Sequence, residues 1–193
     1  MKNLILSNKK NGFTLLEIIV SISLFALVII LVGSVYNLAS SAYRKGANKS
    51  ELAQNARVCL DRISREVRQA VDMITILPET GDDADFPAPS EIFFRDGHNP
   101  DEITYIEYYL SDGELHRAHL AYYFSVAPDD YVIYDSVDDY GDNPDELVLE
   151  DLVVGEYFTE LKFWGDDGVV NIYAELEKNQ DKIEMETAVF MRN

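Results

Sequence analysis

The sequence predicts an α+β protein in which one long N-terminal helix precedes an antiparallel β-sheet head. Residues 13–36 are apolar except for a few small polar residues, Tyr36 and one charged residue, Glu17. Residues 53–74 then place apolar side chains at alternating spacings of three and four, which is typical of an amphipathic helix. From about residue 91 onward, short apolar–polar alternations separated by Asp, Gly and Pro clusters predict strands.

Charge is divided unevenly along the 193 residues, a length that suits one domain with an appendage. Residues 1–76 carry 10 basic and 5 acidic side chains, whereas residues 77–193 carry 6 basic and 30 acidic ones, a net charge of −24. Such an acidic surface repels phosphates, so we expect no direct nucleic-acid partner. Cys59 is the only cysteine, which excludes an intramolecular disulfide.

The apolar run is long enough to cross a membrane. As a helix, its 24 residues span roughly 36 Å, against about 30 Å for a bilayer core. Its 16 Leu, Ile, Val and Phe side chains contribute roughly −5 to −10 kcal/mol towards insertion, and Glu17 costs about 2.5 to 3.5 kcal/mol. Insertion therefore wins, and the preceding Lys2, Lys9 and Lys10 predict a cytoplasmic N-terminus with the C-terminal part outside.

Two ordinary interpretations leave something unexplained. A secretory signal would have a shorter apolar core, although "LASSA" at 38–42 offers a cleavage site. A plain membrane anchor fits the length but gives Glu17 no role.

The stretch "KKNGFTLLEIIVSISLF" from Lys9 resembles the class III signal of type IV prepilins and pseudopilins. The resemblance implies cleavage between Gly12 and Phe13 by a prepilin peptidase/methyltransferase, which then N-methylates Phe13. Glu17 becomes the fifth mature residue, and its carboxylate is expected to pair with the α-amine of Phe13 on a neighbouring subunit. Lys9 and Lys10 are the basic residues of the leader.

This resemblance implies a pilin-like organisation. Residues 1–12 form the leader, 13–36 the transmembrane and filament-core helix, 37–77 an amphipathic stem helix, and 78–193 an acidic antiparallel β head. The protein would be a single-pass cytoplasmic-membrane precursor with its head outside, and then part of an extracytoplasmic filament. Its expected partners are other major and minor pilins or pseudopilins and an inner-membrane assembly platform.

The stem is expected to continue the helix from Phe13 to about Ile76, bent or interrupted near Gly33 or Gly46. Many pilins have a proline in the apolar segment, but here none occurs before Pro78. The predicted stripe could be a coiled-coil seam, but it is short and alanine-rich, so we favour packing against a sheet of the same chain. The stripe comprises Ala53, Ala56, Leu60, Ile63, Val67, Ala70 and Ile74.

Seven or eight strands are expected in the β head. The strongest signal is a hairpin of residues 103–110 and 114–120 around Asp112–Gly113, a favoured turn pair. The other predicted strands are residues 91–96, 129–137, 146–154, 158–165, 169–177 and 182–191.

Several segments resemble the minor pseudopilin group that includes the J-type subunit of type II secretion and the W-type minor pilins. They are "LDRISREVRQA" in the stem, Leu115–Arg117, Phe158–Leu161–Phe163 and Arg192–Asn193. The order of these pieces along the chain carries the resemblance.

Sequence patterns assign no catalytic residues and no cofactor. His116 and His119 lie three apart on a predicted strand, where side chains face opposite sides, so they are not expected to share a metal. Asp138, Asp139 and Asp142 are the best calcium candidates, but their spacing does not match the EF-hand template and a solvated loop is favoured.

The predicted function is that of a minor type IV pilin or pseudopilin subunit rather than an enzyme. Secretion, adhesion, twitching and competence machines all remain open. The alternative is a membrane-anchored extracytoplasmic binding domain that is not assembled into a filament.

Overall fold

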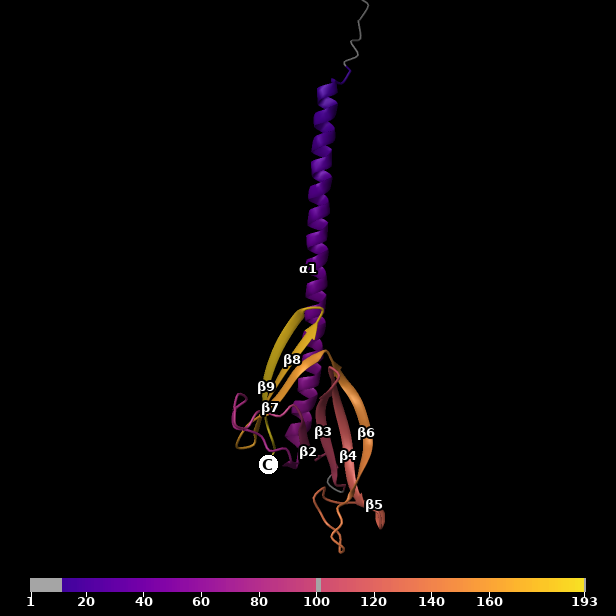
Figure 1. The fold of residues 1–193 in the computed structure, drawn as a ribbon, viewed down its shortest axis with the longest axis vertical. Helices are drawn as coiled ribbons and strands as arrows, with labels where there is room; N and C mark the ends of the chain where they lie inside the picture. Colours follow the sequence, from indigo (N-terminus) through magenta and orange to yellow (C-terminus); the bar gives the residue numbers. More distant parts are fainter. Residues whose placement is uncertain (1–11, 100–101, 193) are drawn as a thin grey trace, which may run out of the picture. The chain divides into compact units, whose positions relative to one another are not determined.

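The computed structural model describes residues 12–99 and 102–192, which contain one long helix and nine strands (Figure 1). The chain divides into a unit that extends to Gly46, here the N-terminal unit, and a unit from Ala47 onward, the C-terminal unit. The elements are α1 (Leu15–Gln69), β1 (Asp72–Met73), β2 (Ile92–Arg95), β3 (Thr104–Ser111), β4 (Glu114–Phe124), β5 (Ala127–Tyr131), β6 (Asp145–Glu156), β7 (Phe158–Trp164), β8 (Val169–Lys178) and β9 (Asp181–Phe190). The predicted α+β class, with a long apolar helix preceding antiparallel strands, is confirmed.

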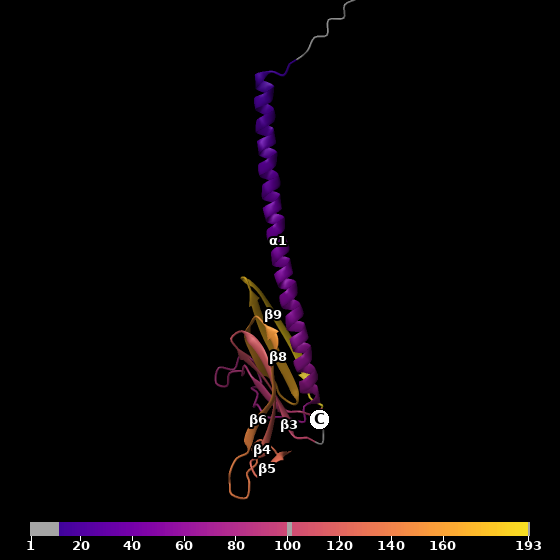
Figure 2. The same cartoon turned by 90° about the vertical axis from the view of Figure 1, so that its right-hand side faces the viewer.

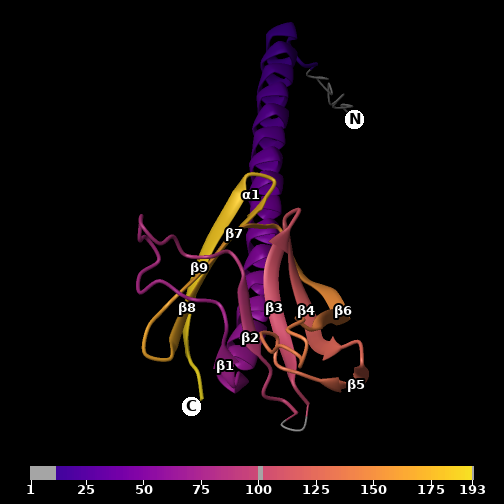
Figure 3. The ribbon, with the colours of Figure 1, turned by 60° about the horizontal axis from the view of Figure 1, so that its bottom comes forward.

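The strands form two antiparallel sheets instead of one. The larger sheet has the order β1-β2-β3-β4-β5, with β6 also paired to β4, and the smaller sheet has the order β7-β8-β9. Figure 3 shows the two sheets side by side. Tyr157, with a φ of 69°, separates β6 from β7, and this sharp change of direction takes the chain from one sheet to the other.

The β3–β4 hairpin is built as its turn residues predict. Asp112 and Gly113 have φ values of 52° and 82°, the two positive values that a type I′ turn requires. Ser111 is paired with Glu114 directly next to this turn. The register of the hairpin is therefore fixed by local chemistry.

The core of the C-terminal unit forms where α1, from Ala47 onward, packs on both sheets (Figure 2). One buried cluster joins the helix to the inner residues of β2, β3, β7 and β8. The predicted stripe is confirmed at Ala56, Leu60, Ile63 and Val67, which are all buried. It was wrong beyond Gln69, because Ala70 is buried after the end of the helix and Ile74 is half-buried in the segment that follows. Leu52 and Cys59 are also buried, whereas Ala53 is only half-buried. Packing against a sheet of the same chain, rather than a coiled-coil seam, is therefore confirmed within this unit.

The helix ends earlier than predicted, at Gln69 instead of about Ile76. The next residues turn away because Val71 donates its backbone N–H to Arg95 at 3.0 Å and β1 pairs with β2. Residues 71–76 contain several β-branched side chains, which favour extended backbone. At the end of α1, Arg192 donates its backbone N–H to the carbonyl of Arg68 at 3.1 Å.

Two further sequence predictions were wrong in detail. Gly33 and Gly46 both lie inside α1 with helical neighbours on both sides, so the predicted interruption does not occur. The strand expected at 129–137 is instead β5, Ala127–Tyr131, followed by a turn in which Ser136 donates its backbone N–H to Ile133. The Asp- and Gly-rich sequence beyond residue 134 favours this turn.

Packing of the stripe predicts which helix positions determine stability. Replacing Ile63, which is fully buried, with alanine should lower the free energy of unfolding by about 2–5 kcal/mol, because it leaves a cavity. Replacing Val58, which is 59% exposed on the same helix, with alanine should cost about 0.5 kcal/mol or less. Urea unfolding of the full chain in detergent micelles, followed by Trp164 fluorescence, measures both. Equal losses would contradict the packing.

Candidate functional site

The N-terminal end of α1 begins directly after the predicted cleavage point. Gly12 and Phe13 lie in irregular backbone, and Phe13 is 79% exposed. A Cβ placed on Gly12 would have open space around it, so the peptide bond between Gly12 and Phe13 is not shielded by the described residues. Lys9 and Lys10 lie outside the described residues.

Thr14 caps the helix, and Glu17 occupies its first turn. The carbonyl of Thr14 accepts the backbone N–H of Ile18 at 3.2 Å, and its Oγ1 accepts the backbone N–H of Glu17 at 3.3 Å. This is an N-cap, in which a hydroxyl satisfies a helix N–H that has no partner in the helix. An acidic side chain in the first turn is also stabilised by the helix dipole, by about 0.3–1 kcal/mol at an exposed site. The sequence "TLLE" therefore specifies where the helix starts.

The Glu17 side chain is exposed, and no cation pairs with its carboxylate within the described part of the chain. The carboxylate lies one helical turn inside the apolar segment, on the same chain as the exposed Phe13. It is therefore open to a cationic partner from another molecule. The structure places Phe13 and Glu17 at the same end of the helix and shows no ion pair between them.

The serine hydroxyls in the apolar part of α1 are hydrogen-bonded to the helix backbone. Ser21, Ser23 and Ser34 each donate a hydroxyl hydrogen to the carbonyl four residues earlier, at 2.7–2.9 Å. These bonds satisfy the hydroxyls without water. All residues of α1 up to Leu38 are exposed, and α1 is the one helix among the described residues that is long and apolar enough to cross a membrane. A continuous apolar surface of this size needs lipid or other apolar helices to cover it.

Comparison with protein families gives one finding at this end of the chain. Residues 7–33 match the model described as the prokaryotic N-terminal methylation motif. This match supports the resemblance to the type IV pilin signal, and it spans the proposed cut, Phe13 and Glu17. No curated protein matches the chain.

In the C-terminal unit, the most notable polar group is a buried cluster that the sequence did not predict. Glu66 of α1 accepts hydrogen bonds from Arg117 Nε at 2.9 and 3.0 Å and from the Tyr108 hydroxyl at 2.8 Å. Arg117 also reaches Glu150 at 3.3 Å, and Arg62 lies 3.5 Å from Glu66. The cluster joins the stem helix to β3, β4 and β6.

Two members of this cluster, Tyr108 and Arg117, are kept in their protonated forms. Burial, and then the charge of Glu66, raise the pKa of Tyr108, so its hydroxyl stays protonated and donates. Burial opposes the charge of Arg117, but its hydrogen bond to Glu66 and the charge of Glu66 raise its pKa overall. One sequence signal could have found Glu66: it lies three residues after Ile63, on the buried stripe.

The rejected metal candidates are arranged as separate contacts. His116 Nδ1 lies 3.2 Å from Asp151, whereas His119 Nε2 lies 4.0 Å from Asp96. Asp138 Oδ1 accepts the backbone N–H groups of Tyr140 and Asp142 at 2.8 and 2.9 Å, which makes it a turn cap. Within the described ranges, no three His, Cys, Asp or Glu residues gather in a group that could hold a metal, and this includes Asp138, Asp139 and Asp142.

Cys59 is a buried thiol, and burial raises its pKa from 9.0 to about 11. Its Sγ lies 3.2 Å from the carbonyl of Val154. We expect no reaction with iodoacetamide at pH 8 in the folded full chain and rapid alkylation in urea, measured by mass spectrometry. Rapid modification of the folded chain would contradict the burial of Cys59.

The same shift predicts a pH dependence. Because the folded pKa lies above the unfolded value, the contribution of the thiol to stability is complete below pH 9 and declines between pH 9 and about 11. The two-unit difference corresponds to about 2–3 kcal/mol. Cys59→Ala should therefore show a shallower loss of stability over that range than the wild type. Parallel pH profiles would contradict the prediction.

The buried ion pair predicts an asymmetric response to mutation. Arg117→Leu should lower the free energy of unfolding by about 3–5 kcal/mol, because it leaves Glu66 charged and buried without its main partner. The double variant Glu66→Leu/Arg117→Leu should be more stable than Arg117→Leu alone. Urea unfolding of the full chain in micelles measures both. A double variant no more stable than Arg117→Leu would show that loss of the shape of Arg117, not the unpaired charge, is responsible.

Proposed function

We propose that this chain is a minor type IV pilin or pseudopilin subunit. Prepilin peptidase cuts it after Gly12, and its N-terminal helix then assembles it into a pilus or a secretion or competence pseudopilus. The observation that carries the proposal is the coincidence at one point of three features: an accessible Gly12–Phe13 bond, a capped helix start at Thr14, and an acid in the first turn of an exposed apolar helix. The methylation-motif match over residues 7–33 supports it.

The role of Glu17 follows from the cost of charge in an apolar medium. Cleavage creates a positively charged α-amine at Phe13, four residues from the carboxylate. Two such charges are each expensive in hydrocarbon but neutralise one another when paired. Pairing between the amine of one subunit and Glu17 of the next sets the axial stagger of neighbouring helices, in the way a single polar residue sets register in a coiled coil.

The minor-subunit assignment rests on the segments that resemble the J-type and W-type group. Glu66 belongs to the stem segment and Arg117 to the β4 segment, and these two side chains form the buried ion pair. Phe158, Leu161 and Phe163 are all buried in the core. In this proposal the protein is a structural subunit without catalysis, and the peptidase, other pilins and the assembly platform are its partners.

Glu17→Ala tests the assembly role. The variant should still insert and be cleaved, because the change makes the helix more apolar, but its share in sheared filaments should fall about tenfold or more since a buried amine is left unpaired. Immunoblots of filament and membrane fractions, from cells that express the other subunits, measure this.

Ser21→Ala is the matched control, one turn along the same helix. It removes a hydroxyl that bonds only to the carbonyl of Glu17, so incorporation should match the wild type. Incorporation of Glu17→Ala at the wild-type level would reject the charge-pairing mechanism. Failure of both variants to be cleaved would point instead to a processing defect.

A further inference from the structure

The outer edge of β6 is a long strand edge with no strand partner among the described residues. Along one edge β6 pairs with β4, from Asp145 to Glu156, and no other described strand pairs with it. Figure 1 shows β6 at the margin of the larger sheet. Its outer row of backbone N–H and C=O groups is a template for another strand, which proteins usually keep short or cover.

Apolar side chains are exposed on both faces of this strand. Cross-strand partners share a face, so Leu147 and Leu152 lie on the face that carries Ala121 and Arg117 of β4. Val148 and Val153 lie on the opposite face and are 53% and 48% exposed. An incoming strand would therefore find apolar neighbours on both sides of the sheet.

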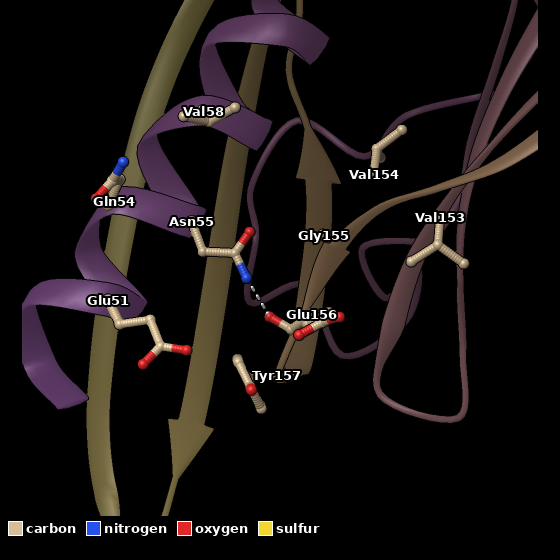
Figure 4. A pocket seen from close by; sticks show the side chains of 9 residues that line it. All are labelled: Glu51, Gln54, Asn55, Val58, Val153, Val154, Gly155, Glu156 and Tyr157. Atoms are coloured by element: carbon tan, nitrogen blue, oxygen red, sulfur yellow. Dashed lines mark hydrogen bonds between the residues drawn. The ribbon is translucent and has the colours of Figure 1, made fainter.

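A groove adjoins the C-terminal end of β6 (Figure 4). It has a volume of about 520 Å³ and lies between the Glu51–Val58 segment of α1 and residues 153–157. Val58, which is 59% exposed, is on its helix wall, and Val153 is on its strand wall. The groove continues past the end of the strand with a mixed lining, in which Glu51, Gln54, Asn55 and Glu156 are polar.

The end of the strand is held rigidly. Asn55 Nδ2 donates a hydrogen bond to the Glu156 carbonyl at 2.8 Å (Figure 4), and Cys59 contacts the Val154 carbonyl. Val154 is the extra residue of a bulge between Val153 and Gly155. A Cβ on Gly155 would lie closer than 3.0 Å to Cys59 and Phe158, so glycine allows this close approach. The C-terminal end of the edge is thus held in place without a partner, which lowers the entropic cost of binding there.

Charge restricts the partner. β6 contains five acidic residues and no lysine or arginine. Glu150 is paired with Arg117 and Asp151 contacts His116, but Asp145, Glu146 and Glu156 have no cationic partner within the described ranges. A second copy is disfavoured, because antiparallel pairing about the strand midpoint would place Glu150 opposite Asp151 and Asp145 opposite Glu156.

We propose that β6 and the adjoining groove form a docking edge for an extended segment of another protein, in which pairs of basic residues alternate with pairs of apolar residues. Each face of such a strand carries both kinds of side chain, as each face of β6 carries both acidic and apolar ones. The segment adds a strand to the larger sheet by main-chain hydrogen bonds. Its basic side chains pair with the carboxylates of β6 that have no cationic partner, of which Asp145 and Glu146 accept hydrogen bonds from Ser125 and Tyr122. This interaction concerns a different surface from the N-terminal helix, and it does not depend on the proposed filament role.

The test uses the full chain in detergent micelles and a labelled peptide as long as β6, in which pairs of lysines alternate with pairs of valines. Fluorescence anisotropy should show binding, and hydrogen exchange should show new protection of β6 amides. The same peptide with proline in place of valine keeps the charge but cannot form a strand. It should bind about tenfold more weakly or worse.

Two variants with equal charge changes locate the site. Val148→Lys/Val153→Lys places two lysines on the docking edge and should weaken binding about tenfold or more. Val71→Lys/Ile76→Lys is the matched control, because both residues are exposed beside β1, at the other end of the strand order. It should bind like the wild type.

Several results would overturn the proposal. They are no binding of the lysine–valine peptide, equal binding of the proline peptide, equal binding by both variants, and self-association of the chain through β6. Hydrogen exchange on the wild type alone decides the matter if the β6 variant does not fold: a bound peptide without protection of β6 amides rejects strand addition.

Discussion

One physical constraint dominates the N-terminal unit, the free-energy cost of placing the Glu17 carboxylate in an apolar helix. An unpaired charge in hydrocarbon is expensive, and the apolar surface of α1 up to Leu38 has no cover within its own unit. Thr14 caps the start of the helix, and Ser21, Ser23 and Ser34 are satisfied by the carbonyls four residues earlier. Glu17 is the one charged residue between Phe13 and Leu38, and no cation pairs with it within the described residues. The α-amine that cleavage would create at Phe13 is a partner of the right charge at the right end of the helix.

The C-terminal unit also contains a carboxylate in an apolar setting, that of Glu66, and here the partners come from the same chain. Glu66 is buried on the stripe of α1, and it is tolerated because Arg117 and Tyr108 supply three hydrogen bonds to its carboxylate. A buried pair of this kind adds little stability relative to an apolar substitute, but it is costly to break. Its geometry also fixes the rotation of the helix on the sheet. The helix thus carries two acids in different settings. Glu66 is buried and hydrogen-bonded to the larger sheet, whereas Glu17 is exposed near the start of the helix.

The features that are encoded locally could be predicted from the sequence. The apolar run, the stripe at Ala56 to Val67 and the Asp112–Gly113 turn each depend on residues close together in the chain. The end of α1 at Gln69 could not, because it depends on hydrogen bonds from Val71 to Arg95 and from Arg192 to Arg68. The division into two sheets depends on the backbone of Tyr157, a residue type that rarely adopts positive φ.

Within the candidate site, the processing residues Gly12 and Phe13 stay a prediction, which rests on a contiguous motif. The Glu66–Arg117 pair, whose members lie 51 positions apart in the chain, and the exposed edge of β6 could not be predicted. The outer edge of β6 is exposed because β6 pairs with β4 along its other edge, and this pairing is a tertiary feature. Sequence alternation identifies a strand, but it does not show whether that strand lies at the edge of a sheet.

The central claim is that the chain is cut between Gly12 and Phe13 and enters a filament pathway. Mass spectrometry of the mature N-terminus, in cells with and without prepilin peptidase, tests it most directly. The account predicts a chain that starts at N-methylated Phe13 only when the peptidase is present. A chain that starts near Ala42, or that keeps Met1 in both strains, would contradict it and remove the assembly role proposed for Glu17.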